Sequence, residues 1–313
     1  MKISRIGHSE NKEKCCVISL GVGKNSFVNS LKRLEESLHR VRFEGDFIYW
    51  NESLPEGCPE HFDAPFAFKT YCFYKAKELG YKQILWMDST TIAIRSLVPV
   101  FDDIRKHGYV FFNNNYGQTL GQWISDEALL QNGLTREEAM SIPELPCSVM
   151  GLSMESDLAR NFLDQWHLIM ADGVTAKGTR ASIQDWNEYQ DIFWNRNNRI
   201  SMDDRVKGHR CDQPAAGIVA NRLGMIPYSD HLKDIHHQAK PVKRNTIILH
   251  HREFQDDITP LSQIYYRVFI DTPFLEKPRS VVRKAWRQTR IKKLLKSIRS
   301  AYRTITKTKP SQH

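Results

Sequence analysis

The sequence has no run of 18 apolar residues, and its N-terminal region lacks the apolar core of a signal peptide. A helix that spans a bilayer needs about 20 predominantly apolar residues, and a secretory signal needs a shorter apolar stretch near the N-terminus. The sequence therefore argues against a membrane-spanning protein, and we expect it in the cytoplasm. At 313 residues, 41% of them hydrophobic, the chain is long enough to build one sizeable core.

Several motifs of metal and nucleotide binding are also missing. The six cysteines form no C-x-x-C pair, so neither a zinc ribbon nor a dithiol redox motif is indicated. The glycine turn Gly21–Lys24 is not a P-loop, because Ile18 and Asn25 stand where that pattern requires Gly and Ser or Thr. It is not a dinucleotide fingerprint either, because Ser26 replaces the third glycine. A tight turn between a strand over 16–20 and a helix over 28–38 is the interpretation that remains.

Acidic residues are absent from residues 279–313, which contain 12 Lys and Arg. The rest of the chain has 33 basic against 36 acidic residues, so the net charge of +9 comes from this tail. Apolar residues recur among the cations at approximately helical spacing and predict a basic amphipathic helix. These residues are Val282, Trp286, Leu294, Leu295, Ile298, Ala301, Tyr302 and Ile305. Such a helix suits an anionic membrane surface, and a disordered, solvated tail is the alternative.

This charge distribution divides the chain into a domain over residues 1–278 and a basic tail over 279–313. We expect the tail to attach the protein peripherally to the inner face of the membrane. Nucleic acid is not the expected partner, because a globular nucleic-acid-binding domain would carry a basic face of its own. A nucleic-acid binder that uses the tail is kept as an alternative.

An apolar run that ends in an aspartate is the most informative stretch of the domain. Residues 83–90 read Gln-Ile-Leu-Trp-Met-Asp-Ser-Thr, which predicts a buried strand that delivers the carboxylate of Asp88 to the edge of a sheet. In open α/β sheets, ligands bind outside the carboxyl ends of the strands. Asp88 is therefore a candidate for contact with a metal–nucleotide or a polar substrate. Capping of the following loop is the alternative.

Helical patterns flank this strand on both sides. Phe68, Cys72, Ala76 and Leu79 recur at helical spacing within residues 64–81, and Gly80 predicts the end of that helix. A second helix over 101–107 leads to a strand over 109–113. A strand, a helix and a second strand in this order predict a parallel sheet.

The segment from Phe68-Lys69 through the predicted helix to Asp88-Ser89-Thr90 resembles the stretch around the Asp-x-Asp motif of GT-A-type nucleotide-sugar glycosyltransferases. The Asp212-Gln213 pair before an apolar helix is similar to the later Asp-Gln pair of the family 8-like group. The resemblance consists of short fragments spread over roughly residues 15–252. It implies a GT-A (Rossmann-like) fold, with a mixed, mainly parallel sheet and flanking helices.

The resemblance also implies a divalent cation, Mn²⁺ or Mg²⁺, held against the donor diphosphate by two carboxylates. Thr90 replaces the second of these aspartates, so the motif retains a single carboxylate, that of Asp88. The hydroxyls of Ser89 and Thr90 follow it in the sequence. Hard oxygen ligands suit these cations, and the loss of one anionic ligand weakens the site. Neutralisation of the diphosphate by Lys69, which resembles a basic donor-binding residue of the family, is the alternative. A solvated helix lysine is the other interpretation of Lys69.

In the resembled enzymes, a histidine after a late strand supplies a further metal ligand. His250 and His251 follow the apolar run over 246–249, and alternation along a strand lets only one of them serve. We assign the role to His250, and a structural role is the alternative. By the same resemblance, Asp212 and Gln213 lie beside the anomeric carbon and the sugar hydroxyls. From the residues alone, the segment is also an ordinary N-terminal cap with proline in the first turn.

Trp186 and Trp194 lie in a polar and aromatic segment over 172–210. They are expected to pack in the core, and stacking on a pyranose ring is the alternative. The hypothesis for the whole chain is a sugar transferase with a nucleotide-diphosphate donor and a glycan or lipid-linked acceptor, in cell-surface polysaccharide synthesis. A catalytically inactive sugar-nucleotide binding module is the second alternative, because Thr90 departs from the motif.

Overall fold

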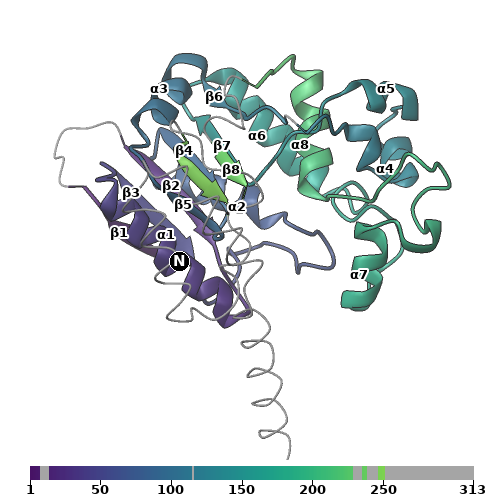
Figure 1. The fold of residues 1–313 in the computed structure, drawn as a ribbon, viewed down its shortest axis with the longest axis horizontal. Coiled ribbons are helices and arrows are strands. Elements are labelled where there is room, and N and C mark those ends of the chain that lie inside the picture. The colour runs from purple at the N-terminus through teal and green to yellow at the C-terminus, as the bar shows by residue number, and fades with distance from the viewer. Residues whose placement is uncertain (8–13, 115, 228–234, 238–245, 251–313) are drawn as a thin grey trace, which may run out of the picture. The chain divides into compact units, whose positions relative to one another are not determined.

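The computed structural model of the protein describes residues 1–7, 14–114, 116–227, 235–237 and 246–250. A six-stranded sheet lies at its centre, with the strand order β1-β3-β2-β4-β7-β6 (Figure 1). Its strands are β1 (Lys2–Arg5), β2 (Cys15–Leu20), β3 (Asp46–Trp50), β4 (Gln83–Met87), β6 (Tyr109–Val110) and β7 (Val149–Ser153). A smaller sheet contains β5 (Thr91–Ala93), β9 (Ile248–His250) and β8 (Ile235–His237).

Four of the six central strands run in the same direction. β3, β2 and β4 are mutually parallel neighbours, whereas β1 is antiparallel to β3. β7 is antiparallel to both β4 and β6, so β6 runs in the direction of β4. The predicted mixed, mainly parallel sheet is confirmed. The predicted strand–helix–strand unit is correct in direction, but β7 lies between its two strands.

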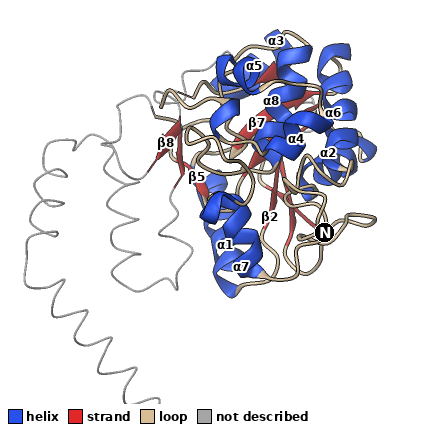
Figure 2. Cartoon of the chain, turned by 90° about the vertical axis from the view of Figure 1, so that its right-hand side faces the viewer, coloured by secondary structure: helices blue, strands red, loops and turns tan. Residues whose placement is uncertain are grey.

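Helices cover both faces of the sheet (Figure 2). They are α1 (Asn25–Arg40), α2 (Phe68–Glu78), α3 (Val98–His107), α4 (Asp126–Gln131), α5 (Arg136–Ser141), α6 (Asp157–Met170), α7 (Trp186–Phe193) and α8 (Asp212–Arg222), with two short 3-10 turns, η1 (Leu120–Gln122) and η2 (Arg196–Asn198). One apolar cluster joins the sheet to α2, α6 and α8, and a second joins it to α1 and α3. Figure 1 shows α4, α5 and α7 together on one side of the sheet.

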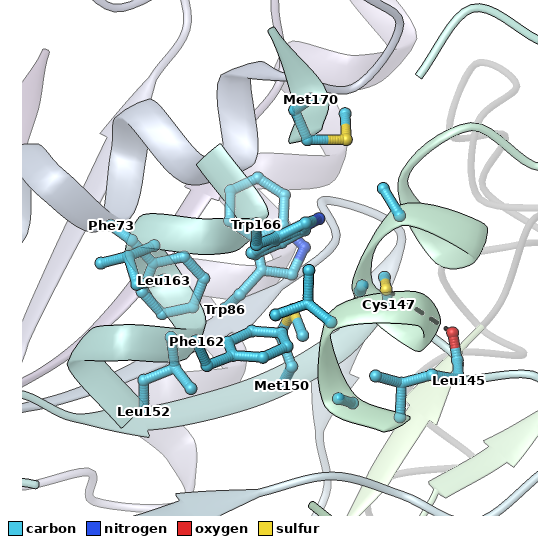
Figure 3. Packing of buried hydrophobic residues seen from close by; sticks show 14 of the residues in the cluster. Phe73, Trp86, Leu145, Cys147, Met150, Leu152, Phe162, Leu163, Trp166 and Met170 are labelled. Carbon is cyan, nitrogen blue, oxygen red and sulfur yellow. Dashed lines mark hydrogen bonds between the residues drawn. The ribbon is translucent and has the colours of Figure 1, made fainter. Parts of the chain in front are cut away.

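Strict alternation along β4 assigns its side chains to the two apolar clusters. Ile84 and Trp86 belong to the cluster with α2 and α6, and Leu85 and Met87 belong to the cluster with α1 and α3. The period of two therefore directs Asp88, the next residue in the even series, toward α2. Figure 3 shows part of the first cluster, with Trp86 among the labelled side chains.

The helix predicted before β4 is real but shorter than residues 64–81. Cys72 and Ala76 are fully buried, and Gly80 has the left-handed φ of 81° that ends such a helix. Leu79, expected on the buried face, is 36% exposed because it is the C-terminal cap of α2. Among the described residues, no helix is long and apolar enough to cross a membrane. The boundary at 278, the tail over 279–313 and His251 lie outside the described residues and stay predictions.

His209 connects three distant loops from a fully buried position. Its Nε2–H donates to the carbonyl oxygen of Thr175 (2.9 Å), and its Nδ1 accepts from the backbone N–H of Ser125 (3.3 Å). These two contacts define a neutral imidazole, since a proton on Nδ1 would face another N–H. Burial lowers the pKa of His209 to about 4.

We expect the free energy of unfolding to fall as the pH decreases from 7 to 4. The unfolded chain takes up a proton near pH 6.5, whereas folded His209 takes it up only near pH 4. The contribution of His209 to the free energy of unfolding is therefore fully present above pH 6.5 and is lost toward pH 4. The loss amounts to up to about 3 kcal/mol, at 1.36 kcal/mol per pKa unit. Urea unfolding of wild type and His209→Gln at several pH values measures this. Exposed His39→Gln is the control, and equal pH slopes for wild type and His209→Gln would contradict the assignment.

Candidate functional site

The ammonium of Lys69, in the first turn of α2, is buried between two carboxylates. Lys69 is 3% exposed, and its Nζ donates to Asp212 Oδ2 (2.7 Å) and to the carbonyl oxygen of Cys147 (2.8 Å). Asp88 Oδ1 lies 3.2 Å from the same nitrogen. Two hydrogen bonds and one ion pair thus hold the ammonium in place. We call Lys69, Asp88 and Asp212 the ion cluster.

Aromatic rings enclose the rest of the ammonium group. Nζ of Lys69 lies 5.3 Å from the ring centroid of Trp86 and 5.6 Å from that of Phe66. Cations are attracted to ring faces at such distances. The alternative interpretation of Lys69 as a solvated helix lysine is therefore wrong.

Asp88 is the member of the ion cluster nearest to solvent. Its side chain is 30% exposed, compared with 4% for Lys69 and 5% for Asp212. Trp86 Nε1–H donates to Asp88 Oδ1 (2.8 Å), and the backbone N–H of Asp88 donates to the carbonyl oxygen of Ser148 (2.8 Å). Oδ2 accepts no hydrogen bond from a described residue. One oxygen of Asp88 is fixed inside the protein, and the other is left for a ligand.

Asp212 is the first residue of α8, and its carboxylate faces Lys69 rather than capping the helix. The N-cap is Cys211, which has φ 58° and ψ −98° and makes no side-chain cap bond. This positive φ in a non-glycine residue costs on the order of 1–3 kcal/mol. The helix start predicted from the residues alone, with Pro214 in the first turn, is confirmed. Gln213 is partly exposed beside it.

The charges of the ion cluster stabilise one another. Burial lowers the pKa of Lys69, but Asp212 and Asp88 outweigh this effect and hold it above its ordinary value. Burial raises the pKa of Asp212, and the positive charge of Lys69 opposes that shift. With both carboxylates ionised, the cluster has one more negative than positive charge.

A second buried network lies two residues before Asp212 and has no signal in the sequence. Arg210 Nη1 donates to both oxygens of Glu144 (2.7 and 2.8 Å), and its guanidinium lies 3.6 Å from the ring centroid of Trp123. Asn114 Nδ2 donates to Glu144 Oε2 (2.7 Å). Burial raises the pKa of Glu144, and Arg210 opposes the shift. The network fixes the chain that leads into α8.

The predicted metal ligands are only partly brought together. Asp88, Ser89 and Thr90 are consecutive at the end of β4, and Ser89 and Thr90 are buried. His250 lies on β9, paired with Thr91 of β5. No group of three or more His, Cys, Asp and Glu side chains is placed to hold a metal ion within the described ranges. The residues therefore fit a cation with one protein carboxylate, completed by substrate oxygens, rather than a site built by the protein alone.

The core positions predicted for Trp186 and Trp194 are wrong. Trp186 is 49% exposed and Trp194 is 45% exposed. They stand at the first residue and at the C-cap of α7, whose buried face is formed by Tyr189 and Ile192. Sequence spacing does not distinguish a core tryptophan from a surface one in such a short helix.

No protein-family model matches the sequence, and no curated relative matches it. Similar solved structures include a glycosyltransferase involved in the glycosylation of the major capsid of PBCV-1, with 14% identity over 76% of this chain and 93% of that chain and a TM-score of 0.41. Mouse xyloside xylosyltransferase 1 has 9% identity over 77% and 99%, with a TM-score of 0.43. The galactosyltransferase LgtC, in complex with donor and acceptor sugar analogs, has 12% identity over 76% and 87%, with a TM-score of 0.34. Because these TM-scores lie below 0.5, the inference of function rests on the ion cluster.

Replacing Lys69 with methionine is expected to destabilise the protein by about 3–5 kcal/mol, because it leaves the buried carboxylate of Asp212 uncompensated. Urea unfolding at pH 7 measures the loss. Lys75→Met, which removes an exposed pair with Glu78 in the same helix, is the matched control and should leave the unfolding midpoint nearly unchanged. Adding Asp212→Asn to Lys69→Met should restore part of the stability. Equal effects of the Lys69 and Lys75 variants would contradict the buried cluster.

Proposed function

We propose that the protein is a glycosyltransferase that moves a sugar from a nucleotide-diphosphate donor to a glycan or lipid-linked acceptor. The observation that supports this best is the ion cluster at the carboxyl end of β4. In open α/β sheets this edge is where ligands bind. Buried, paired charges at a ligand-binding edge are more typical of a functional site than of the core alone.

The carboxyl ends of the parallel strands supply further polar groups to this edge. The glycine turn with Lys24 follows β2, and Asn51 follows β3. Ser148 precedes the antiparallel β7 and therefore reaches the same edge. We infer that a donor lies along these strand ends, with its diphosphate at Asp88.

A divalent cation fits the charge of this site. The ion cluster alone is net negative, so a diphosphate beside it needs additional positive charge. Asp88 Oδ2, assisted by the hydroxyls of Ser89 and Thr90, would hold Mn²⁺ or Mg²⁺, and the donor phosphates would complete its shell. His250 is retained as a candidate ligand. When bound, the cation supplies charge neutralisation of the leaving diphosphate.

Lys69 then acts as a positioning residue rather than as the diphosphate partner, because its ammonium is buried and already lies against three protein oxygens. It fixes Asp212, which with Gln213 would orient the transferred sugar. Catalysis of this kind consists mostly of positioning and leaving-group stabilisation, so no nucleophilic triad is required. By resemblance, the Asp-Gln pair points to retention of anomeric configuration.

The second candidate is a sugar-nucleotide binding module without turnover. Thr90 favours it, since the missing carboxylate weakens the cation that stabilises a leaving group. The two candidates share the donor site and differ in whether the donor is consumed. For either one, the basic tail over 279–313 is proposed to contact an anionic membrane surface, where a lipid-linked acceptor would be found.

The test is a thermal-shift screen of the full chain against UDP-, GDP- and CDP-sugars, with and without Mn²⁺. At a ligand concentration of 100 times Kd, one nucleotide class should raise the midpoint by roughly 5–10 °C. Asp88→Asn should abolish the shift, and Asp102→Asn, an exposed acid paired with Arg105 on α3, should not. Donor hydrolysis, followed in the same samples, separates a transferase from a binding module. No shift with any nucleotide would refute the donor site.

Thr90→Asp should restore a second carboxylate beside Asp88 and tighten Mn²⁺ binding to the nucleotide-bound protein by roughly tenfold or more, because affinity rises with the number of charged ligands. Titration of Mn²⁺ monitored by electron paramagnetic resonance measures this. Ser96→Asp, which adds a carboxylate at an exposed position between β5 and α3, is the control. Unchanged Mn²⁺ affinity in Thr90→Asp would remove Asp88 from the metal site.

A further inference from the structure

Two tryptophans are held at the surface by a rigid base. Trp186 stacks on Tyr189 with a centroid distance of 4.9 Å and an interplanar angle of 24°. Tyr189 is buried, and its hydroxyl lies 3.7 Å from the sulfur of Cys211, the residue that precedes Asp212. Trp194 Nε1–H donates to Gln190 Oε1 (3.1 Å). Large exposed side chains with such fixed orientations are typical of binding surfaces rather than of incidental exposure.

A row of ring contacts leads from Trp186 to the ion cluster. His61 makes an edge-to-face contact with Trp186 (5.8 Å) and another with Phe66 (5.2 Å). Phe66 is one of the two rings that flank the ammonium of Lys69. Burial lowers the pKa of His61 to about 4, so this row is uncharged at neutral pH.

A second row leads from Trp194 toward the same cluster. Trp194 lies edge to face with buried Trp123 (6.1 Å). The guanidinium of Arg210 lies over the ring of Trp123. Arg210 is two residues before Asp212. Both exposed indoles are therefore connected, through side chains in contact, to the residues proposed to orient the transferred sugar.

The polar groups around the two indoles suit an uncharged, hydroxyl-rich ligand. Arg196 pairs with Asp191 (3.6 Å), and Arg199 pairs with Glu188 (3.8 Å), so these charges are satisfied within the protein. The exposed amides of Asn197 and Asn198, which have left-handed φ values of 55° and 54°, follow Trp194.

Lys24, exposed in the glycine turn after β2, lies 5.9 Å from the ring centroid of Trp186. It makes no ion pair with a described residue. Its ammonium can donate to a hydroxyl of a ligand that rests on the indole.

We infer that Trp186 and Trp194 form the acceptor-binding surface, on which pyranose rings of a carbohydrate acceptor stack. Sugars present a flat C–H face to a ring and hydroxyls at its rim, which matches an indole bordered by amides and an ammonium. Trp194 follows Trp186 by eight positions, which correspond to about 12 Å along a helix axis. The surface therefore favours an acceptor of more than one sugar ring. This inference rests on the proposed function and names its acceptor class.

The experiment is glycan-array binding of the full chain in the presence of the stabilising nucleotide, followed by titration of the best-bound oligosaccharide. Trp186→Ala and Trp194→Ala should each weaken glycan binding at least tenfold, and Trp186→Phe should restore part of it. The Kd for the nucleotide should stay unchanged in all three. Leu168→Ala, which truncates a 69% exposed residue on α6, is the control and should change neither affinity.

Three outcomes would overturn the inference. One is glycan binding that survives in the double tryptophan variant, and another is no binding of any arrayed glycan by the wild type. The third is a loss of nucleotide affinity in Trp186→Ala with glycan binding intact, which would place the donor base on the indole. Failure of the donor site is distinguishable, because it would appear as nucleotide binding that is absent or insensitive to Asp88→Asn.

Discussion

The burial of one ammonium group is the constraint on which the site and much of the domain depend. Lys69 takes its acceptors from the end of β4, from the segment before β7 and from the start of α8. An ammonium buried without such partners would cost several kcal/mol, so these segments must occupy their places together. The fold and the candidate site are thus stabilised by the same contacts, and a shift of α8 relative to β4 would disrupt both.

Residues 208–212 show how the structure fixes the start of α8. A Cβ on Gly208 would lie 1.9 Å from the carbonyl oxygen of Phe193, so only glycine permits this approach. His209 and Arg210 are bound to separate loops, and Cys211, which follows them, has a positive φ. Strain of this kind persists where neighbouring contacts over-determine the backbone. Asp212 therefore reaches Lys69 already oriented, as a preorganised site requires.

Local patterns predicted the parts of the site, and tertiary contacts determined how they meet. The apolar run before Asp88 and the helix pattern around Lys69 are visible in the sequence, because burial imposes a period of two or of about 3.6. The pairing of Lys69 with Asp212 joins residues 143 positions apart, and no local pattern carries that information. The same holds for the buried Glu144 and for the insertion of β7 beside β4. The core position predicted for Trp186 is wrong because α7 is short and lies to one side of the sheet rather than packed on one of its faces (Figure 1).

The insertion of β7 between β4 and β6 sets an order of events during synthesis. Among the described strands β6 pairs with β7 alone, and β4 lacks one of its two neighbours until residues 149–153 have been made. At roughly 5–20 residues per second, the nascent chain spends several seconds with the apolar edge of β4 open and the adjacent Phe111 and Phe112 without their final partners. An open strand edge is a template for pairing with another chain. The open edge of β4 therefore exposes the nascent chain to pairing with other chains until β7 has been made. Binding of a chaperone to the ribosome-bound N-terminal half of the domain would prevent such pairing.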